Sequence, residues 1–452
     1  MNNQNSIAKL HKEKNQSVTT IKTLELENIG LFEHLKLDFD PKCAVLIGLN
    51  GTGKTTILRS LALSLIGVQE GVHENNIAES LLRIMGRKEN QGNWAQSGKI
   101  RTILEIDGEE YTNQVILTPN WQTGDIQIQK ADTALFDDKG YLKSLIIGFS
   151  QQRGIFTKRQ RKTPTIKIMP PKVGDLLALI NNDEGGTLHS FVSWIANLDI
   201  DIKNGAVKKR RLLEKAFDIF SEIVEEKVRF DAVTSVDPLE LWIKTKDSPH
   251  GIPIRLTSLG YQSIMAWIGY FLKRIYEANG GNENFYDAPA IVIVDEIDLF
   301  LHPLWQSRIL RVLIKNFPNT QFIVTTHSPL VVAGLAFKQV TQLYYEENKL
   351  VAKQNEVDIW VWQYQDILSR LFQTQQHFTE YEEKVRPEIK KLRAIEQRTE
   401  EQEQKLKRLI ETNHQESRAA VDEIAAIRQR LESKENELTA LIQNLSEHNA
   451  LC

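Results

Sequence analysis

Residues 48–55 read GLNGTGKT, and this stretch decides the fold. Its glycines, lysine and threonine have the spacing of a phosphate-binding loop. Glycines allow successive backbone N–H groups to turn inward around an anion, and the dipole of a following helix favours the same anion. We therefore expect Lys54 to contact the β- and γ-phosphates of ATP and Thr55 to bind Mg²⁺. The other expected nucleotide-binding residues are Asn50, Gly51 and Gly53 of this segment and Thr56, which follows it.

The sequence on each side of the loop agrees with this interpretation. Cys43 to Ile47 is a short apolar run between Pro41 and Gly48, which is typical of a buried strand. After the loop, apolar residues recur at helical spacing up to Leu65, and Gly67 is a natural helix stop. A plain strand-to-helix turn is therefore a poor alternative.

A second apolar run ends in two carboxylates. Ala290 to Val294 reads as a buried strand, and Asp295 and Glu296 follow it. In an open α/β sheet, ligands bind beyond the carboxyl ends of the strands. We expect Asp295 to hold Mg²⁺ and Glu296 to act as a catalytic residue that polarises the attacking water. Acids at a strand end are common, so this prediction depends on their pairing with the phosphate loop.

Three further polar segments are weaker candidates. Gln151 and Gln152 follow an apolar run and would supply a metal-bound amide, although two solvated loop glutamines are an equally good interpretation. His327 ends another buried strand and would reach the γ-phosphate as a second catalytic residue, although a lone histidine is usually structural. Ser258 and Gly260 open a helix, where they would bind an anion or form an ordinary N-cap.

The composition excludes several classes of protein. The 452 residues are 41% hydrophobic and 25% charged, which excludes a wholly disordered or collagen-like chain. Only two cysteines are present, which excludes a disulfide framework and a cysteine zinc site and favours a reducing cytoplasm. No apolar run reaches the roughly 18 residues that span a bilayer, and the polar N-terminus does not read as a signal peptide.

The chain divides into four predicted parts. Residues 1–17 form a loose arm, and 18–340 form an α/β head with a helical, basic insertion at about 150–235. Residues 341–380 are expected to be linker helices. In residues 381–452, two heptad patterns flank a plausible turn, which predicts a helical hairpin with a coiled-coil seam. The alternative for this tail is one long helix that serves as a spacer.

Local basic segments stand out against a formal net charge of only -3. Residues 139–174 contain basic residues and no acid, and Lys208 to Arg211 form a second basic cluster. Such segments favour contact with the phosphate backbone of DNA. The alternative is a basic loop that is balanced by neighbouring acids.

The order of these pieces along the chain is the most specific signal: phosphate loop, glutamine, serine–glycine helix start, acid pair, histidine. Over residues 18–340 the chain resembles the ABC-type ATPase heads of the SMC, RecF and OLD kind, which implies a mixed sheet flanked by helices. DEIDLFLHP at 295–303 and THSP at 326–329 are similar to AAA-type ATPases of anti-phage defence, most of all to the PtuA family of Septu systems and some retrons.

The resemblance implies a homo-oligomer built from head-to-tail dimers. The phosphate loop and acid pair of one chain would hold ATP and Mg²⁺, while Ser258 and Gly260 of a second chain would close over the γ-phosphate. Nucleotide state would then set dimer geometry. Leu259 departs from the small or acidic residue of relatives, which leaves slow hydrolysis and nucleotide sensing without turnover as open alternatives.

The resemblance also implies a nuclease partner. OLD proteins carry a metal nuclease domain after the ATPase, and residues 341–452 show no such domain, so DNA cleavage would come from an HNH nuclease subunit of the PtuB type. The tail hairpin and Ile359 to Trp362 are candidate docking or oligomerisation surfaces. The alternative is that Trp360 and Trp362 belong to a core.

A second function class stays open at this point. It is a DNA-repair ATPase of the RecF kind, which clamps duplex DNA without a nuclease. A transporter motor is disfavoured because no surface for a membrane partner is visible. We expect a cytoplasmic protein without membrane association, with ATP and Mg²⁺ as cofactors and DNA as a further partner.

Overall fold

A computed structural model divides the chain into two compact units, Met1–Phe372 and Gln373–Cys452. The residues that it describes are 17–66, 81–82, 84–88, 91–119, 126–130, 134–153, 168–182, 186–234, 239–346, 349–355, 367, 371 and 404–405. Nearly all of the predicted arm and coiled-coil hairpin therefore lies outside the described residues, as do Trp360 and Trp362.

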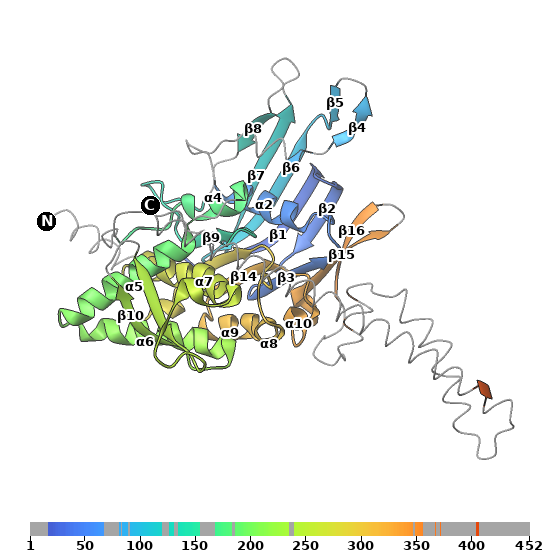
Figure 1. The fold of residues 1–452 in the computed structure, drawn as a ribbon. Coiled ribbons are helices and arrows are strands. Elements are labelled where there is room, and N and C mark those ends of the chain that lie inside the picture. The colour runs from blue at the N-terminus through green and yellow to red at the C-terminus, as the bar shows by residue number, and fades with distance from the viewer. Residues whose placement is uncertain are drawn as a thin grey trace, which may run out of the picture. The chain divides into compact units, whose positions relative to one another are not determined.

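The centre of the first unit is a six-stranded sheet in the order β16-β15-β3-β14-β13-β9 (Figure 1). All neighbouring strands pair in parallel except β15 and β16, which form an antiparallel hairpin at the edge. The strands are β3 (Cys43–Gly48), β9 (Leu145–Phe149), β13 (Ala290–Val294), β14 (Thr320–Thr325), β15 (Val340–Glu346) and β16 (Lys349–Gln354).

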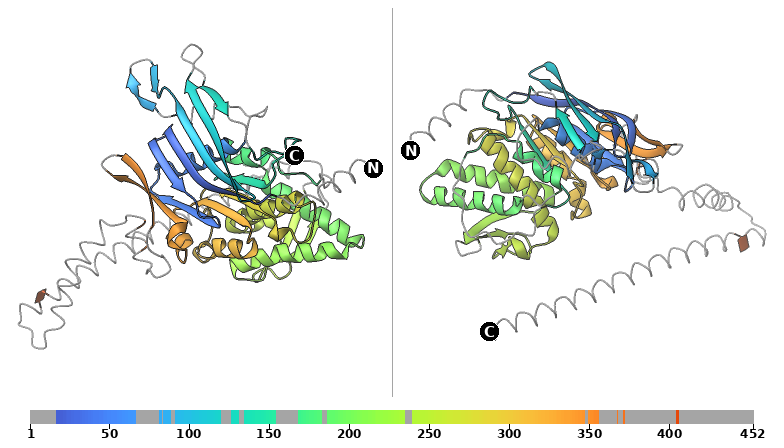
Figure 2. Two further views of the ribbon diagram at one scale, coloured as in Figure 1. Left: turned by 180° about the vertical axis from the view of Figure 1, so that it is seen from behind. Right: turned by 90° about the horizontal axis from the view of Figure 1, so that it is seen from above.

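Both faces of this sheet are covered, which explains why its central strands read as continuous apolar runs. Val45 and Ile47 of β3 belong to a core shared with helices, whereas Ala44 and Leu46 belong to a core shared with a second sheet. The second sheet is antiparallel in the order β2-β1-β6-β7-β8 (Figure 2). Its strands are β1 (Thr19–Ile29), β2 (Phe32–Asp38), β6 (Gly98–Ile106), β7 (Glu109–Pro119) and β8 (Ile126–Lys130).

The helices lie on both sides of the central sheet. In chain order they are α2 (Lys54–Leu65), α4 (Gly174–Asn181), α5 (Thr187–Lys203), α6 (Val207–Val224), α7 (Leu259–Ala278), α8 (Pro303–Gln306), α9 (Ile309–Asn316) and α10 (Pro329–Val332). Two small sheets complete the described strands, β4 (Ile84–Lys88) with β5 (Gln91–Trp94), and β10 (Arg229–Thr234) with β11 (Glu240–Lys244) and β12 (Ile252–Pro253). Among the described residues, no helix has the length and apolarity needed to cross a bilayer.

The predicted α/β fold class is confirmed, because a mixed sheet carries helices around a phosphate loop. One local expectation differs from the structure. The linker helices expected from residue 341 begin instead as β15 and β16, because β15 pairs with β3 and extends the central sheet.

Candidate nucleotide-binding site

The carboxyl ends of four parallel strands meet at one edge of the central sheet. Val294 of β13 lies level with Phe149 of β9 and with Val324 of β14, and Val324 lies level with Val45 of β3. The segments that follow these strands are therefore brought together, as expected for the ligand edge of an open sheet. They contain the phosphate loop, the glutamines, the acid pair and the histidine.

The loop between β3 and α2 has the backbone geometry that its glycines predict. Gly51 and Gly53 have φ angles of 80° and 78°, in the left-handed region that glycine adopts without strain. Helix α2 begins directly after Gly53, and no side chain caps its first turn. The N–H groups at a helix start without a side-chain cap suit an anion. Asn50 is exposed in the loop, and Thr56 packs against Gly30.

Lys54 is buried, and it forms no ion pair with the described residues. Its Nζ donates instead to the carbonyl oxygens of Gly48 at 2.8 Å and Leu49 at 3.0 Å. Burial lowers the pKa of Lys54, while the carboxylates that follow β13 raise it. A buried ammonium group without an ion pair is suited to receive a phosphate oxygen.

Asp295 is the centre of a hydrogen-bonded cluster and is only 1% exposed. Its Oδ2 accepts from the hydroxyl of Thr55 at 2.8 Å and from Nε2 of Gln151 at 3.2 Å. Its Oδ1 accepts from the hydroxyl of Thr325 at 2.6 Å. These contacts fix the carboxylate beside the phosphate loop, with a hydroxyl and an amide close to it.

Glu296 follows in a conformation that non-glycine residues rarely adopt, with φ of 50°. Its backbone N–H donates to the hydroxyl of Thr325 at 2.7 Å, and its Oε1 accepts from Nε2 of Gln151 at 3.0 Å. Burial raises the pKa of Glu296, as do Asp295 and Asp298, whereas nearby cations lower it. A raised pKa suits a carboxylate that accepts a proton from water.

The two candidate glutamines have different positions. Gln151 is half-buried and donates to both carboxylates of the acid pair. Gln152 is exposed, and its backbone N–H and carbonyl oxygen bond with the hydroxyl of Ser150. The structure therefore brings Gln151 into the cluster and leaves the side chain of Gln152 outside it.

His327 lies at the same edge, half-buried after β14. Its backbone N–H donates to Oδ1 of Asp298 at 3.3 Å. Burial lowers the pKa of His327 and the charge of Lys54 lowers it further, while Asp298 and Asp295 oppose this shift. The lowered pKa favours the neutral imidazole, which can accept one hydrogen bond and donate another.

Ser258 and Gly260 lie at the start of α7, and neither is hydrogen-bonded to the phosphate loop of the same chain. Ser258 is the N-cap of α7, yet its exposed hydroxyl makes no capping hydrogen bond. Gly260 is buried, and a Cβ there would lie 2.7 Å from the Trp305 ring and 2.9 Å from the Phe300 carbonyl oxygen. Close packing within the chain thus explains the glycine, while the serine hydroxyl stays available.

Three residues of the site were not singled out from the sequence. Thr325 bridges Asp295 and the backbone of Glu296, and Asp298 accepts from Thr326 at 2.5 Å and from His327. Arg153 contacts the backbone carbonyls of both members of the acid pair. The polar residues at the end of an apolar run were the available signal for Thr325, but nothing local marks Arg153.

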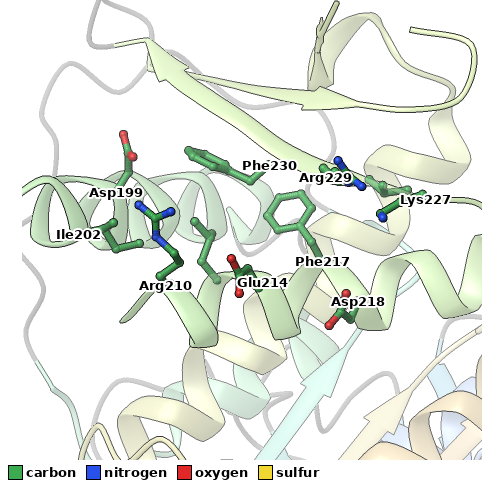
Figure 3. Close-up of a pocket in the computed structure, with 11 residues that line it drawn as sticks. Asp199, Ile202, Arg210, Glu214, Phe217, Asp218, Lys227, Arg229 and Phe230 are labelled. Atoms are coloured by element: carbon green, nitrogen blue, oxygen red, sulfur yellow. The ribbon is translucent and has the colours of Figure 1, made fainter. Parts of the chain in front are cut away.

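A cavity of about 550 Å³ lies elsewhere in the first unit, between α5, α6 and β10 (Figure 3). Acidic and basic side chains line it around Phe217 and Phe230, namely Asp199, Glu214, Asp218, Arg210, Lys227 and Arg229. None of the candidate site residues lines this cavity. It is therefore separate from the phosphate loop.

The side chains of Thr55 and Asp295 are suited to bind an Mg²⁺ ion that is carried by a nucleotide. Mg²⁺ prefers oxygen ligands and usually takes only one or two from protein side chains, with water and phosphate completing the octahedron. Thr55 and Asp295 place a hydroxyl and a carboxylate oxygen 2.8 Å apart. No cluster of three or more histidine, cysteine or acidic residues that could form a closed metal cage occurs among the described residues.

Comparisons with known proteins identify relatives of the chain. The chain is 25% identical over 378 residues to "Retron Vc95 probable ATPase" of Vibrio cholerae, covering 70% of this chain and 73% of that protein. It is 26% identical over 341 residues to "Septu protein PtuA" of Bacillus thuringiensis, covering 73% and 76%. The predicted resemblance to PtuA and retron ATPases is therefore confirmed.

Among solved structures, the chain is similar to the Smc head domain from Pyrococcus furiosus, with a TM-score of 0.47 and 15% identity over 74% of this chain and 96% of that chain. The model of one protein family matches residues 43–333, from the start of β3 to the end of α10, and so contains every candidate site residue. This chain therefore belongs to the family described as "AAA domain, putative AbiEii toxin, Type IV TA system".

Proposed function

We propose that this protein is an ATP-binding regulatory subunit of an anti-phage defence complex, which controls a partner HNH nuclease that cleaves DNA. The observation that carries the proposal is the hydrogen-bonded cluster of Thr55, Asp295, Glu296 and Gln151 beside Lys54. The names of the Septu and retron relatives support the defence role.

Each residue of the cluster has a specific role in the proposed site. Lys54 binds the β- and γ-phosphates in place of its carbonyl partners, and Thr55 and Asp295 orient the metal. Bound Mg²⁺ supplies charge neutralisation for the phosphates. Glu296 accepts the proton of the attacking water, and Gln151 holds both carboxylates in position.

The proposal includes a head-to-tail dimer that completes the site. The exposed hydroxyl of Ser258, which caps nothing in its own chain, supports a role toward a second chain. Leu256 and Leu259, which flank it in sequence, have exposed apolar side chains, and so has Phe300, whose backbone carbonyl oxygen packs against Gly260. Exposed apolar side chains that lie close together are a feature of protein interfaces. ATP bound by one chain then sets the geometry of the pair.

The proposed DNA contact is supported by α6. Lys208, Arg210 and Arg211 are exposed, and they form no ion pair with the described residues. They lie near the start of the helix, where the dipole disfavours positive charge. Cations in that position do not stabilise the helix, but they can bind the phosphates of an external polyanion.

Nucleotide binding through Lys54 tests the proposal. We expect Lys54→Ala to weaken ATP binding by about 10- to 100-fold, because a charge-assisted contact is lost. Lys22→Ala is the control, since Lys22 is a surface residue paired with Glu105 and should leave ATP affinity unchanged. Equal ATP affinity in wild type and Lys54→Ala would contradict the proposed site.

The partner is tested by purification from the native operon. A complex that contains an HNH nuclease, and whose mass changes with ATP and Mg²⁺, is the expected result. A chain that binds duplex DNA and ATP but purifies without a nuclease would favour the RecF-type alternative. Phosphate release in the same preparations separates turnover from nucleotide sensing.

A further inference from the structure

Arg153 is a buried guanidinium between two segments of the candidate site. It is 4% exposed and follows β9 by four residues. Its Nη1 donates to the carbonyl oxygen of Ser150 at 2.7 Å. Its Nη2 donates to the carbonyl oxygen of Asp295 at 2.7 Å and also to that of Glu296. One side chain therefore ties the segment after β9 to the segment after β13.

These contacts hold the backbone from which both candidate carboxylates project. Glu296 has the left-handed φ of 50°, which needs support from its surroundings. Thr325 accepts from its N–H, and Arg153 donates to its carbonyl oxygen. The peptide groups on both sides of the Glu296 Cα are thus fixed by neighbours from β14 and from the end of β9.

A comparison with Arg274 shows that Arg153 is not an ordinary buried ion pair. Arg274 is also buried, and it pairs directly with Asp175 at 2.8 Å and with Glu277. Arg153 has no such pair with the described residues, and its Nε is a buried donor without a partner there. A buried charge that bonds mainly to carbonyl oxygens is costly for stability alone. Its position beside the acid pair offers a functional reason for keeping it.

Arg153 is itself anchored to a helix. Its carbonyl oxygen accepts from the hydroxyl of Thr187 at 2.7 Å, and Thr187 is the first residue of α5. The backbone of Arg153 is therefore held by α5, while its guanidinium bonds to the backbone of the acid pair.

We propose that Arg153 is a positioning residue, which holds Asp295 and Glu296 in the orientation that binds and uses the metal–nucleotide complex, with Thr187 as its anchor. This inference rests on the proposed function, because it assigns a role toward the same site. Arg153 acts through the two backbone carbonyls and does not itself touch the nucleotide.

The test is a titration of Mg²⁺ into the full-length chain with a fluorescent ATP analogue. In Arg153→Gln, we expect a rise of about 10-fold in the Mg²⁺ concentration that gives half of the maximal increase in binding of the analogue. Loss of hydrogen bonds from a charged group has a cost of this magnitude. Affinity for the analogue in EDTA should change less than about 2-fold, because the phosphate loop is intact. Arg153→Lys should restore part of the Mg²⁺ response, and Thr187→Val should raise the half-maximal concentration about 3-fold.

Arg59→Gln is the matched control. Arg59 is a half-buried arginine near Asp295, but it donates to the carbonyl oxygen of Ile180 at 2.9 Å and not to the acid pair. In Arg59→Gln, Mg²⁺ should strengthen binding of the analogue as much as it does in wild type. If Arg153→Gln does not fold, Arg153→Lys and Thr187→Val decide the question, and wild-type Mg²⁺ responses in both would overturn the inference.

The controls also separate this inference from the proposed function. A wild-type chain that binds no ATP analogue, or whose binding Mg²⁺ does not strengthen, contradicts the proposed function. If wild type responds to Mg²⁺ and folded Arg153→Gln responds equally, only the role of Arg153 is contradicted.

Discussion

The hydroxyl of Thr55 donates to the carboxylate of Asp295 at 2.8 Å, although 240 residues separate the two along the chain. Thr55 lies in the first turn after the β3 loop, and Asp295 directly follows β13. The strand order places β14 between β3 and β13. Thr325, the last residue of β14, completes the arrangement by donating to the other oxygen of Asp295.

This pairing predicts the effect of removing the Thr55 hydroxyl. Thr55→Val should keep most of the affinity for ATP that is measured without Mg²⁺. The factor by which Mg²⁺ increases this affinity should fall about 10-fold, because one proposed metal ligand is absent. Thr55→Ser should retain the enhancement. Calorimetric titration with and without EDTA measures the ATP affinity in the absence and presence of Mg²⁺. If Mg²⁺ increases the affinity of Thr55→Val as much as that of wild type, Thr55 is excluded as a ligand.

Glu296→Gln separates binding from turnover. Glutamine keeps the size of the side chain but cannot accept the proton of water, so phosphate release should fall about 100-fold or more below wild type. ATP affinity should change little. A variant that still releases phosphate at the wild-type rate would remove Glu296 from the catalytic role.

Thr325 offers a stability test with a control in the same strand. Thr325→Val removes two buried hydrogen bonds around the acid pair and should lower the free energy of unfolding by about 1–3 kcal/mol. The hydroxyl of Thr320 is buried without a partner among the described residues, so Thr320→Val should be close to neutral. Urea unfolding of both variants checks the difference, and equal losses would refute this account of Thr325.

Ser258→Ala tests whether the free hydroxyl serves a second chain. Because the hydroxyl makes no capping bond, the melting temperature should stay within about 1 °C of wild type, while the ATP-dependent increase in mass is reduced. Ser328→Ala is the contrasting variant, since the Ser328 hydroxyl caps α10 by accepting from the N–H of Leu330. The free energy of unfolding of this variant should fall by about 1 kcal/mol. Light scattering of Ser258→Ala that matches wild type would argue against the trans contact.

The basic start of α6 predicts salt-dependent DNA binding. Replacement of Lys208, Arg210 and Arg211 by Gln should reduce the slope of log affinity against log salt by roughly 2 to 3, at about 0.9 for each phosphate contact. Lys203→Gln is the control, because Lys203 is already paired with Asp199 at 2.7 Å. An unchanged slope in the triple variant would place the DNA contact elsewhere.

Much of the fold could be predicted because its signals are local. The apolar runs of β3, β13 and β14 were visible, and so was the helix that follows the phosphate loop. The hairpin of β15 and β16 was missed, because the pairing of β15 with β3 brings together segments almost 300 residues apart. No pattern within residues 340–354 specifies that pairing.

By itself, the sequence determined the phosphate loop, the acid pair at a strand end and the family to which the chain belongs. The tertiary structure alone decided that Gln151 and not Gln152 joins Asp295, that the Ser258 hydroxyl makes no capping bond, and that Arg153 bonds to the backbone of the acid pair. The physical reason is that glycine spacing and hydrophobic periodicity act between near neighbours. The contacts of the site depend instead on the strand order β3-β14-β13-β9, which long-range packing sets.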